Sequence, residues 1–570
     1  MTLATTAVVE PRLEEARALL RAGRIGQAVG ALRALASENS GLPAVRYQFA
    51  LALEASGDGA GAEAELRAVL ALDPRAAAAA SNLATRLSAK NRFAEAVELL
   101  QPFVGDSAAD VQLLTVLGAA LKGVRRMDEA ADTYALAAAL SPESGVAEHN
   151  LAGAYGDAQR FVESEAAVQR AFEKGLDAPE TWLVHARALQ GLDDFDAAEN
   201  AFREAARRRP DYAEALGELA QLIWMRTGDI GQAIEPLDVA LGAQPWDAQL
   251  SVAKARLLEY GGDSDSAYQV VADAIARQGS VATLEISAAT LIAPIDPQRA
   301  LMHAEAAYRI APDSGPAITS LCHANLAAGR ADVASAIAAD LRRGWPLDQY
   351  PIALAATAWR MLGDPRYREL YDYERLVRAW TLETPPGWSS LAAYLDDLAS
   401  RLRALHRFRA HPVGQSLRGG TQTVQALERR DDPVIKALFT VLDGPIREYM
   451  AMLKRDSAML GPRATEDYRL AGAWSAQLQP HGHHVNHLHQ MGWISSACHI
   501  ALPPAVEEGR EGWLTFGEPG VTTMPRLGPE HFVKPKSGVL VLFPSYMWHA
   551  TVPFGGETPR LSVAFDVTPA

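Results

Sequence analysis

The chain has little of what marks secreted and membrane proteins. Only two cysteines, Cys322 and Cys498, occur in 570 residues, which excludes a disulfide scaffold and a cysteine-based zinc ribbon. It has no run of about 18 apolar residues, which a membrane-spanning helix would need. The start, MTLATTAVVEPRLEEARALL, lacks the basic and then apolar segments of a signal peptide. We therefore expect a cytoplasmic protein with no membrane partner.

Basic residues are also scarce over most of the chain. Residues 371–570 carry 20 Lys and Arg and 20 Asp and Glu, so the net charge of −15 falls on residues 1–370, with 34 basic and 49 acidic residues. Nucleic acid is excluded as a partner, because its phosphates require a basic surface. An acidic surface favours a basic partner, or it serves only to keep the protein solvated.

What the sequence does contain is a repeat of 34 residues through its first two thirds. A small residue marks each unit, and proline follows 12 positions later in six of them. The small residues are Ala28, Ala62, Ala96, Ala130, Ser164, Ala198, Ala233, Ala267, Ala300 and Ala334. Small side chains let two helices approach closely, and proline ends the second helix. This period is that of the tetratricopeptide repeat.

The repeat predicts an all-α tetratricopeptide (TPR) superhelix of ten to eleven repeats over residues 1–372. Its groove is expected to bind a peptide or protein. A helical linker and support region is predicted over residues 373–467. It should contain a helix over residues 389–409, a polar loop over residues 411–423 and a helix pair over residues 432–459.

From Tyr468 onward, the residue pattern changes to short apolar or alternating runs separated by proline and glycine. These runs are YRLAGAWSAQL, GWISSACHIAL, GWLTF, GVLVLFPS, HATVPF and RLSVAFDV. Such spacing is typical of antiparallel strands in a small barrel or jelly roll. Residues 468–570 are therefore predicted to form the double-stranded β-helix (jelly-roll) core of an α+β domain.

Three histidines in this last segment suggest a metal centre. His487 and His489 are one residue apart on a predicted strand, so both imidazoles should point to the same face. His549 on a later strand can complete the site. Arg560 and Ser562 follow, and an arginine can hold a carboxylate through two parallel hydrogen bonds. This set indicates a non-haem iron site with a docking point for an acidic cosubstrate.

Other histidines and tryptophans in this segment are interpreted as structural. His481, His483 and His484 lie in a Pro-Gly context and are expected in a loop. His499 is expected in the core or in a substrate pocket, without ligating the metal. The tryptophans beside the candidate ligands, Trp493 and Trp548, are expected to pack in the wall.

Residues 411–570 resemble the 2-oxoglutarate and Fe(II)-dependent oxygenases that bacteria fuse to TPR arrays. The resemblance is carried by HPVGQSLRGGTQT, His484–His489, Gly492–Ser496, Pro544-Ser545, His549 and Pro559–Ser562. It implies a jelly roll around one Fe(II), with His487, His489 and His549 as metal ligands and catalytic residues. Arg560 and Ser562 would bind 2-oxoglutarate. Dioxygen and 2-oxoglutarate would be consumed to hydroxylate a C–H bond.

One departure from the family concerns His489, which stands where most iron(II) oxygenases use Asp or Glu. The three-histidine set therefore leaves open that the site holds another metal or that the enzyme is a weaker catalyst. Three functions are also open. The chain could hydroxylate a residue of a polypeptide captured by the TPR groove. It could instead hydroxylate a small molecule, with the repeats used for assembly, or be a TPR scaffold with an inactive barrel. Retention of all five site residues argues against the scaffold.

Overall fold

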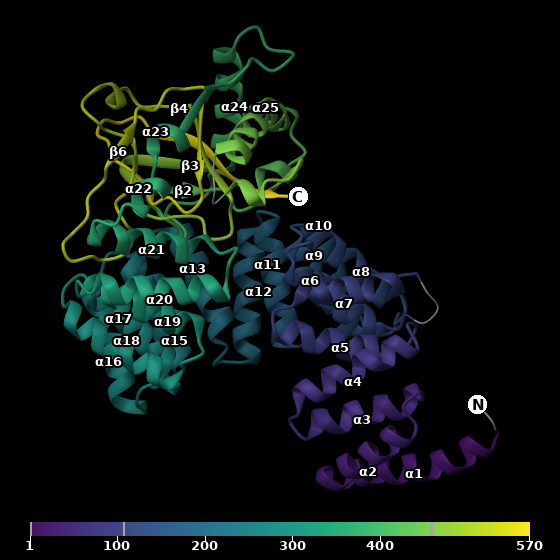
Figure 1. Cartoon of the computed structure of the whole chain (residues 1–570). Coiled ribbons are helices and arrows are strands. Elements are labelled where there is room, and N and C mark those ends of the chain that lie inside the picture. The colour runs from purple at the N-terminus through teal and green to yellow at the C-terminus, as the bar shows by residue number, and fades with distance from the viewer. Residues whose placement is uncertain (1–2, 106–108, 457–459) are drawn as a thin grey trace. The chain divides into compact units, whose positions relative to one another are not determined.

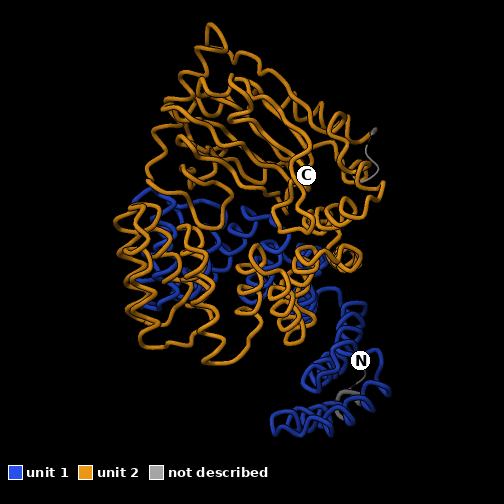
Figure 2. The backbone as a smooth tube through the Cα atoms, turned by 90° about the vertical axis from the view of Figure 1, so that its left-hand side faces the viewer, with its two compact units in different colours: residues 1–194 blue, residues 195–570 orange. Residues whose placement is uncertain are grey.

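The chain divides into two compact units, residues 1–194 and residues 195–570, coloured separately in Figure 2. This is a computed structural model, and it describes residues 3–105, 109–456 and 460–570. Within these ranges the first unit contains helices alone, whereas the second adds two antiparallel β-sheets. No helix in the described part of the chain has the length and apolar character needed to cross a membrane.

Helices follow one another at the predicted spacing in both units (Figure 1). In the first unit they are α1 (Leu3–Arg21), α2 (Ile25–Glu38), α3 (Pro43–Ala55), α4 (Gly59–Leu72), α5 (Ala77–Ala89), α6 (Phe93–Leu100), α7 (Val111–Gly123), α8 (Met127–Ala139), α9 (Gly145–Asp157), α10 (Phe161–Glu173) and α11 (Pro179–Gly191). In the second they are α12 (Phe195–Arg208), α13 (Ala213–Thr227), α14 (Ile230–Ala243), α15 (Ala248–Tyr260), α16 (Ser264–Gln278), α17 (Ala282–Ile292), α18 (Pro297–Ile310), α19 (Gly315–Ala327), α20 (Ala331–Gly344) and α21 (Gln349–Leu362).

The small residues of the repeat lie where paired helices touch, as predicted. All ten are buried. Two members also bond to the partner helix: Ser164 Oγ donates to the Ala152 carbonyl at 2.8 Å, and the Ala334 carbonyl accepts from Cys322 Sγ at 3.4 Å. After α21 comes only the short α22 (Arg366–Leu370), so an eleventh repeat has a shortened second helix. The TPR-like superhelix at the N-terminal end is confirmed.

Beyond the repeats, the helices are α23 (Tyr373–Leu376), α24 (Leu391–Leu405) and α25 (Pro433–Asp456). The larger sheet has strand order β1-β7-β4-β9-β3-β2 and the smaller one β6-β5-β8. The strands are β1 (Arg378–Thr381), β2 (Leu417–Gln422), β3 (Tyr468–His484), β4 (Ile494–Ala501), β5 (Leu514–Phe516), β6 (His531–Val533), β7 (Val539–Pro544), β8 (His549–Thr551) and β9 (Arg560–Pro569).

Several predicted elements differ from those observed. Helix α24 is confirmed, but one helix, α25, stands where a pair was predicted, and Pro445 lies within it; residues 457–459 lie outside the described residues. The predicted loop contains β2, which pairs with β3. Its glycines permit a close approach, because a Cβ on Gly420 would collide with the main chain at Gln477. Strands β1 and β6 were not predicted.

The last repeats share one hydrophobic core with both sheets, extending from Cys322 to Val567. Trp548 Nε1 donates to Thr357 Oγ1 of α21 at 3.0 Å, and Tyr371 donates to the Tyr546 carbonyl at 3.0 Å. The repeats therefore help to position the sheets. Trp493 and Trp548 are buried in this core, in agreement with the packing role predicted for them.

Candidate metal centre

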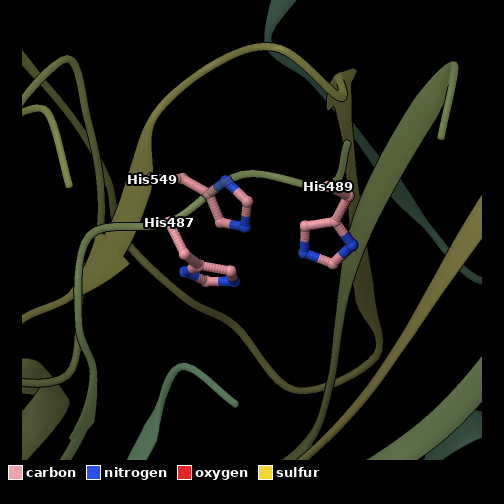
Figure 3. Close-up of side chains that lie close together, drawn as sticks. All are labelled: His487, His489 and His549. Carbon is pink, nitrogen blue, oxygen red and sulfur yellow. The ribbon is translucent and has the colours of Figure 1, made fainter. Parts of the chain in front are cut away.

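His487, His489 and His549 come together, as Figure 3 shows. One ring nitrogen from each lies within 4.8 Å of the others. His549 begins β8, and His487 forms an isolated antiparallel bridge with it. The prediction that His487 and His489 share a strand is wrong, since β3 ends at His484 and His489 lies in the following loop. The bridge and the loop bring the rings together.

Hydrogen bonds determine which nitrogen of each ring is available. His487 Nδ1 bonds to the Val485 carbonyl at 2.8 Å, and His549 Nδ1 bonds to the Met547 carbonyl at 3.0 Å. His489 Nδ1 bonds to Asp566 Oδ2 at 2.7 Å. All three acceptors require a proton on Nδ1, so the Nε2 atoms keep their lone pairs. This is how metal-binding histidines are normally held.

Burial also favours the metal-binding form of two of these rings. It lowers the pKa of His487 and of His549 well below the ordinary value, and the neighbouring histidines add to the effect. Phe543 packs edge-on against His549, with ring centroids 4.7 Å apart. Both rings are therefore neutral at pH 7, and only a neutral imidazole can donate to a metal.

Asp566 is a site residue that sequence reasoning missed. It lies on β9, and its second oxygen accepts a hydrogen bond from Ser495 Oγ at 2.7 Å. His489 stands where most iron(II) oxygenases have an acidic ligand, and Asp566 places a carboxylate directly behind this histidine. A signal was available, because Asp566 is four residues beyond Ser562 and so on the same face of one strand.

Arg560 and Ser562 line the same 380 Å³ cavity as the three histidines. Both residues are buried. Burial lowers the pKa of Arg560 to about 10, so the guanidinium is still charged at pH 7. No carboxylate in the described part of the chain forms an ion pair with it, and its Nε has no partner.

His499 lies beside this arginine, fully buried as predicted. Its Nδ1 accepts from Arg560 Nη2 at 3.2 Å, so Nε2 must carry the proton, and that N–H has no partner. A buried cation with unpaired donors is costly unless an anion meets it. The Arg560 guanidinium lines the cavity and fits a carboxylate ligand such as 2-oxoglutarate.

His481, His483 and His484 end β3 instead of lying in a loop. His484 lines the cavity and bonds through Nδ1 to Ser416 Oγ at 2.9 Å. It is not in the group of three whose nitrogens converge. The roles assigned to His487, His489, His549, Arg560 and Ser562 fit this geometry and stay predictions.

Two protein families match parts of the chain. Residues 472–566 match the family described as "Putative 2OG-Fe(II) oxygenase", and residues 183–248 match the tetratricopeptide repeat. No curated protein matches. Among solved structures, pilF of Pseudomonas aeruginosa is 18% identical, with 37% of this chain and 97% of that chain covered and a TM-score of 0.33.

A tetratricopeptide repeat protein from Parabacteroides merdae is 15% identical, with 48% and 96% covered and a TM-score of 0.33. The chain is therefore similar to the tetratricopeptide repeat over residues 183–248 and to the family described as "Putative 2OG-Fe(II) oxygenase" over residues 472–566.

Proposed function

We propose that this protein is an Fe(II)- and 2-oxoglutarate-dependent dioxygenase that hydroxylates a residue of a polypeptide held by its repeats. One observation carries the proposal. Three histidines each engage Nδ1 in a hydrogen bond and bring one ring nitrogen within 4.8 Å of the others, in a cavity that also contains a buried arginine without an acidic partner.

His487, His489 and His549 would hold Fe(II), and Arg560 with Ser562 would hold the carboxylate of 2-oxoglutarate. When bound, these groups supply dioxygen activation: one oxygen atom enters the substrate C–H bond, and the other enters succinate as 2-oxoglutarate loses CO₂. The family match and the converging histidines support this cofactor pair.

The side chains of the protein would orient the metal ligands and balance the charge of the metal and the cosubstrate. The Nδ1 bonds fix each ring, so that Nε2 needs no reorientation to donate. Asp566 makes His489 a stronger donor, which offsets the missing carboxylate ligand. Arg560 neutralises the acidic cosubstrate in a buried setting, where an unpaired carboxylate would be unfavourable.

We further propose that the two sheets form the double-stranded β-helix core. Support comes from the His487–His549 bridge, which connects the end of β3 to the smaller sheet. A reducing cytoplasm is the proposed compartment, since both cysteines are buried and unpaired. A polypeptide substrate is supported by the repeats, which generally bind peptides or proteins.

Succinate release by the purified full-length chain with Fe(II), 2-oxoglutarate and dioxygen tests the activity. We expect turnover from the wild type and none from His549→Ala. The matched control is His481→Asn, which changes an exposed histidine with a positive φ that asparagine tolerates. An inactive wild type would overturn the function, and an active His549→Ala would overturn the site.

The substrate class needs a separate measurement. A proteolytic digest of a cell extract is incubated with the active chain, and its peptides are compared by mass spectrometry with a digest treated with His549→Ala. We expect selected peptides to gain one oxygen atom. If only small molecules gain oxygen, the alternative of a small-molecule hydroxylase replaces the polypeptide substrate.

A further inference from the structure

A second cavity lies beside the metal centre, on the helices of the last repeats. Its volume is 530 Å³, and it is lined by residues of α17, α19 and α20 and by the start of α21. We name it the repeat cavity. Gln490, the residue after His489, lines both the repeat cavity and the metal-centre cavity.

The main chain joins the two cavities at this residue. The backbone N–H of Gln349 donates to the Gln490 carbonyl at 3.0 Å. A second contact is aromatic: Tyr350 in the repeat cavity packs edge-on against Trp548, with ring centroids 5.8 Å apart. Trp548 directly precedes His549, so the repeat cavity abuts the segments that carry His489 and His549.

The repeat cavity has an acidic side chain but no lysine or arginine among its described lining residues. The one carboxylate among them is that of Asp348. His323 is the one basic side chain among these lining residues, and burial lowers its pKa to about 4, so it is neutral at pH 7. Its Nε2 bonds to the Tyr350 hydroxyl at 2.9 Å. A cation entering this cavity would meet one negative charge and no positive one.

An indole, that of Trp345, lines the same cavity as this carboxylate. Trp345 is 42% exposed, although it packs on Gly315, where an added Cβ would lie 3.1 Å from the ring. Cations bind well over indole faces, and a partly buried carboxylate gains from a charged donor. Burial raises the pKa of Asp348, which is the effect expected of a carboxylate that lacks a cationic partner.

We propose that the repeat cavity binds a lysine or arginine side chain of the polypeptide that is hydroxylated at the metal centre. The hydroxylation in this statement rests on the proposed function, whereas the binding of a basic side chain does not. Asp348 and His489 each lie one residue from the Gln349–Gln490 hydrogen bond, so their Cα atoms are at most about 14 Å apart. An extended peptide advances roughly 3.3 Å per residue, so the basic residue lies within about four positions of the hydroxylated one.

Binding of a small probe to the full-length, metal-free chain tests the cavity directly. The probes are N-acetyl-arginine amide and its neutral analogue N-acetyl-citrulline amide, titrated by ligand-observed NMR. We expect the arginine probe to bind roughly tenfold more tightly, as a charge-assisted pair with a cation–π contact allows. Equal binding of the two probes would overturn the proposal.

Asp348→Asn removes the charge and keeps the fold, because Asp348 caps α21 by accepting from the Tyr350 N–H at 2.8 Å and asparagine caps equally well. Asp332→Asn is the matched control, since it removes an exposed carboxylate of α20 outside the cavity. We expect Asp348→Asn and Trp345→Ala each to weaken arginine binding about fivefold, with Asp332→Asn unchanged. Wild-type binding by Asp348→Asn would overturn the proposal.

Failure of the proposed function is distinguishable from failure of this inference. If the chain releases no succinate, the oxygenase proposal falls, and the two probes still decide what the cavity binds. If peptides are hydroxylated, those with a basic residue within about four positions of the new oxygen should dominate. Equal hydroxylation of peptides without one would overturn the cavity proposal alone.

Discussion

Asp566 Oδ2 accepts a hydrogen bond from His489 Nδ1 at 2.7 Å. The same carboxylate accepts from Ser495 Oγ, so Asp566 is fixed from two sides. Ser495 Oγ is also 2.8 Å from Ser545 Oγ, which extends this support to the end of β7. The three candidate ligands include no carboxylate, but Asp566 supplies a negative charge one hydrogen bond behind His489.

Replacing Asp566 with asparagine should weaken metal binding about 10- to 100-fold, because such outer partners fix the ring and raise its basicity. Anaerobic titration with Fe(II) or Co(II) measures this. Asp467→Asn is the control, as the Asp467 side chain is 74% exposed and should bind metal like the wild type. Unchanged affinity in Asp566→Asn would show that Asp566 does not tune His489.

Replacing Arg560 with lysine should separate cosubstrate binding from metal binding. Lysine keeps the charge but loses the planar pair of donors, so we expect the KM for 2-oxoglutarate to rise about 100-fold, with Fe(II) affinity within about twofold. Succinate release against 2-oxoglutarate concentration is the measurement. Arg469→Lys, on an exposed position of β3, is the control. A parallel loss of metal affinity would mean that Arg560 holds the fold.

Two truncations should behave differently. A chain starting at Phe195 keeps the whole second unit, and we expect its Fe(II) affinity to stay within about threefold of the wild type. A chain starting at Tyr373, after the predicted end of the superhelix, loses two hydrogen-bond acceptors. These are the Thr357 hydroxyl, which accepts from Trp548, and the Leu370 carbonyl, which accepts from Tyr546. Exposing that core should abolish the folded near-ultraviolet circular dichroism signal. A folded, metal-binding chain from Tyr373 would contradict this.

His406 should make stability depend on pH. Its ring nitrogens bond to Thr421 Oγ1 at 2.8 Å and Ser475 Oγ at 2.9 Å, and burial lowers its pKa from 6.5 to about 4. Between these values the unfolded chain binds the extra proton, so stability falls as pH drops from 6.5 toward 4. The loss is of the order of 3 kcal/mol.

Urea unfolding of the wild type and His406→Gln at pH 7.5 and pH 4.5 measures this contribution. Glutamine retains hydrogen-bonding groups and does not titrate. Lowering the pH should therefore reduce the unfolding free energy of the wild type more than that of the variant. Parallel pH dependence in both proteins would show that His406 does not titrate in this window.

The repeat was readable because its determinants are local. Ala62 and Ala96 recur at a fixed spacing and serve the same close helix contact in each unit, so periodicity alone reveals them. The converging histidines were found for a similar reason, since His487 and His489 are neighbours in sequence. His549 depended in part on the family resemblance.

The missed features depend on pairing across long sequence separations. Strand β2 reads as a polar loop because its glycines carry no apolar pattern, and only its partner β3 makes it a strand. Asp566 received no role because its meaning comes from His489, which is remote in sequence and reached only once β9 is placed in the sheet. The three-residue strand β6 is too short for alternation to reveal it.

The His487 and His549 main chains exchange two hydrogen bonds, at 3.0 and 2.9 Å. Two of the three candidate ligands are therefore spaced by the backbone itself, before any ion arrives, whereas His489 depends on a loop and a carboxylate. His487 and His549 would therefore offer a metal ion two ring nitrogens from positions set by the sheet, whereas the third ligand would depend on the loop that carries His489 and on its bond to Asp566.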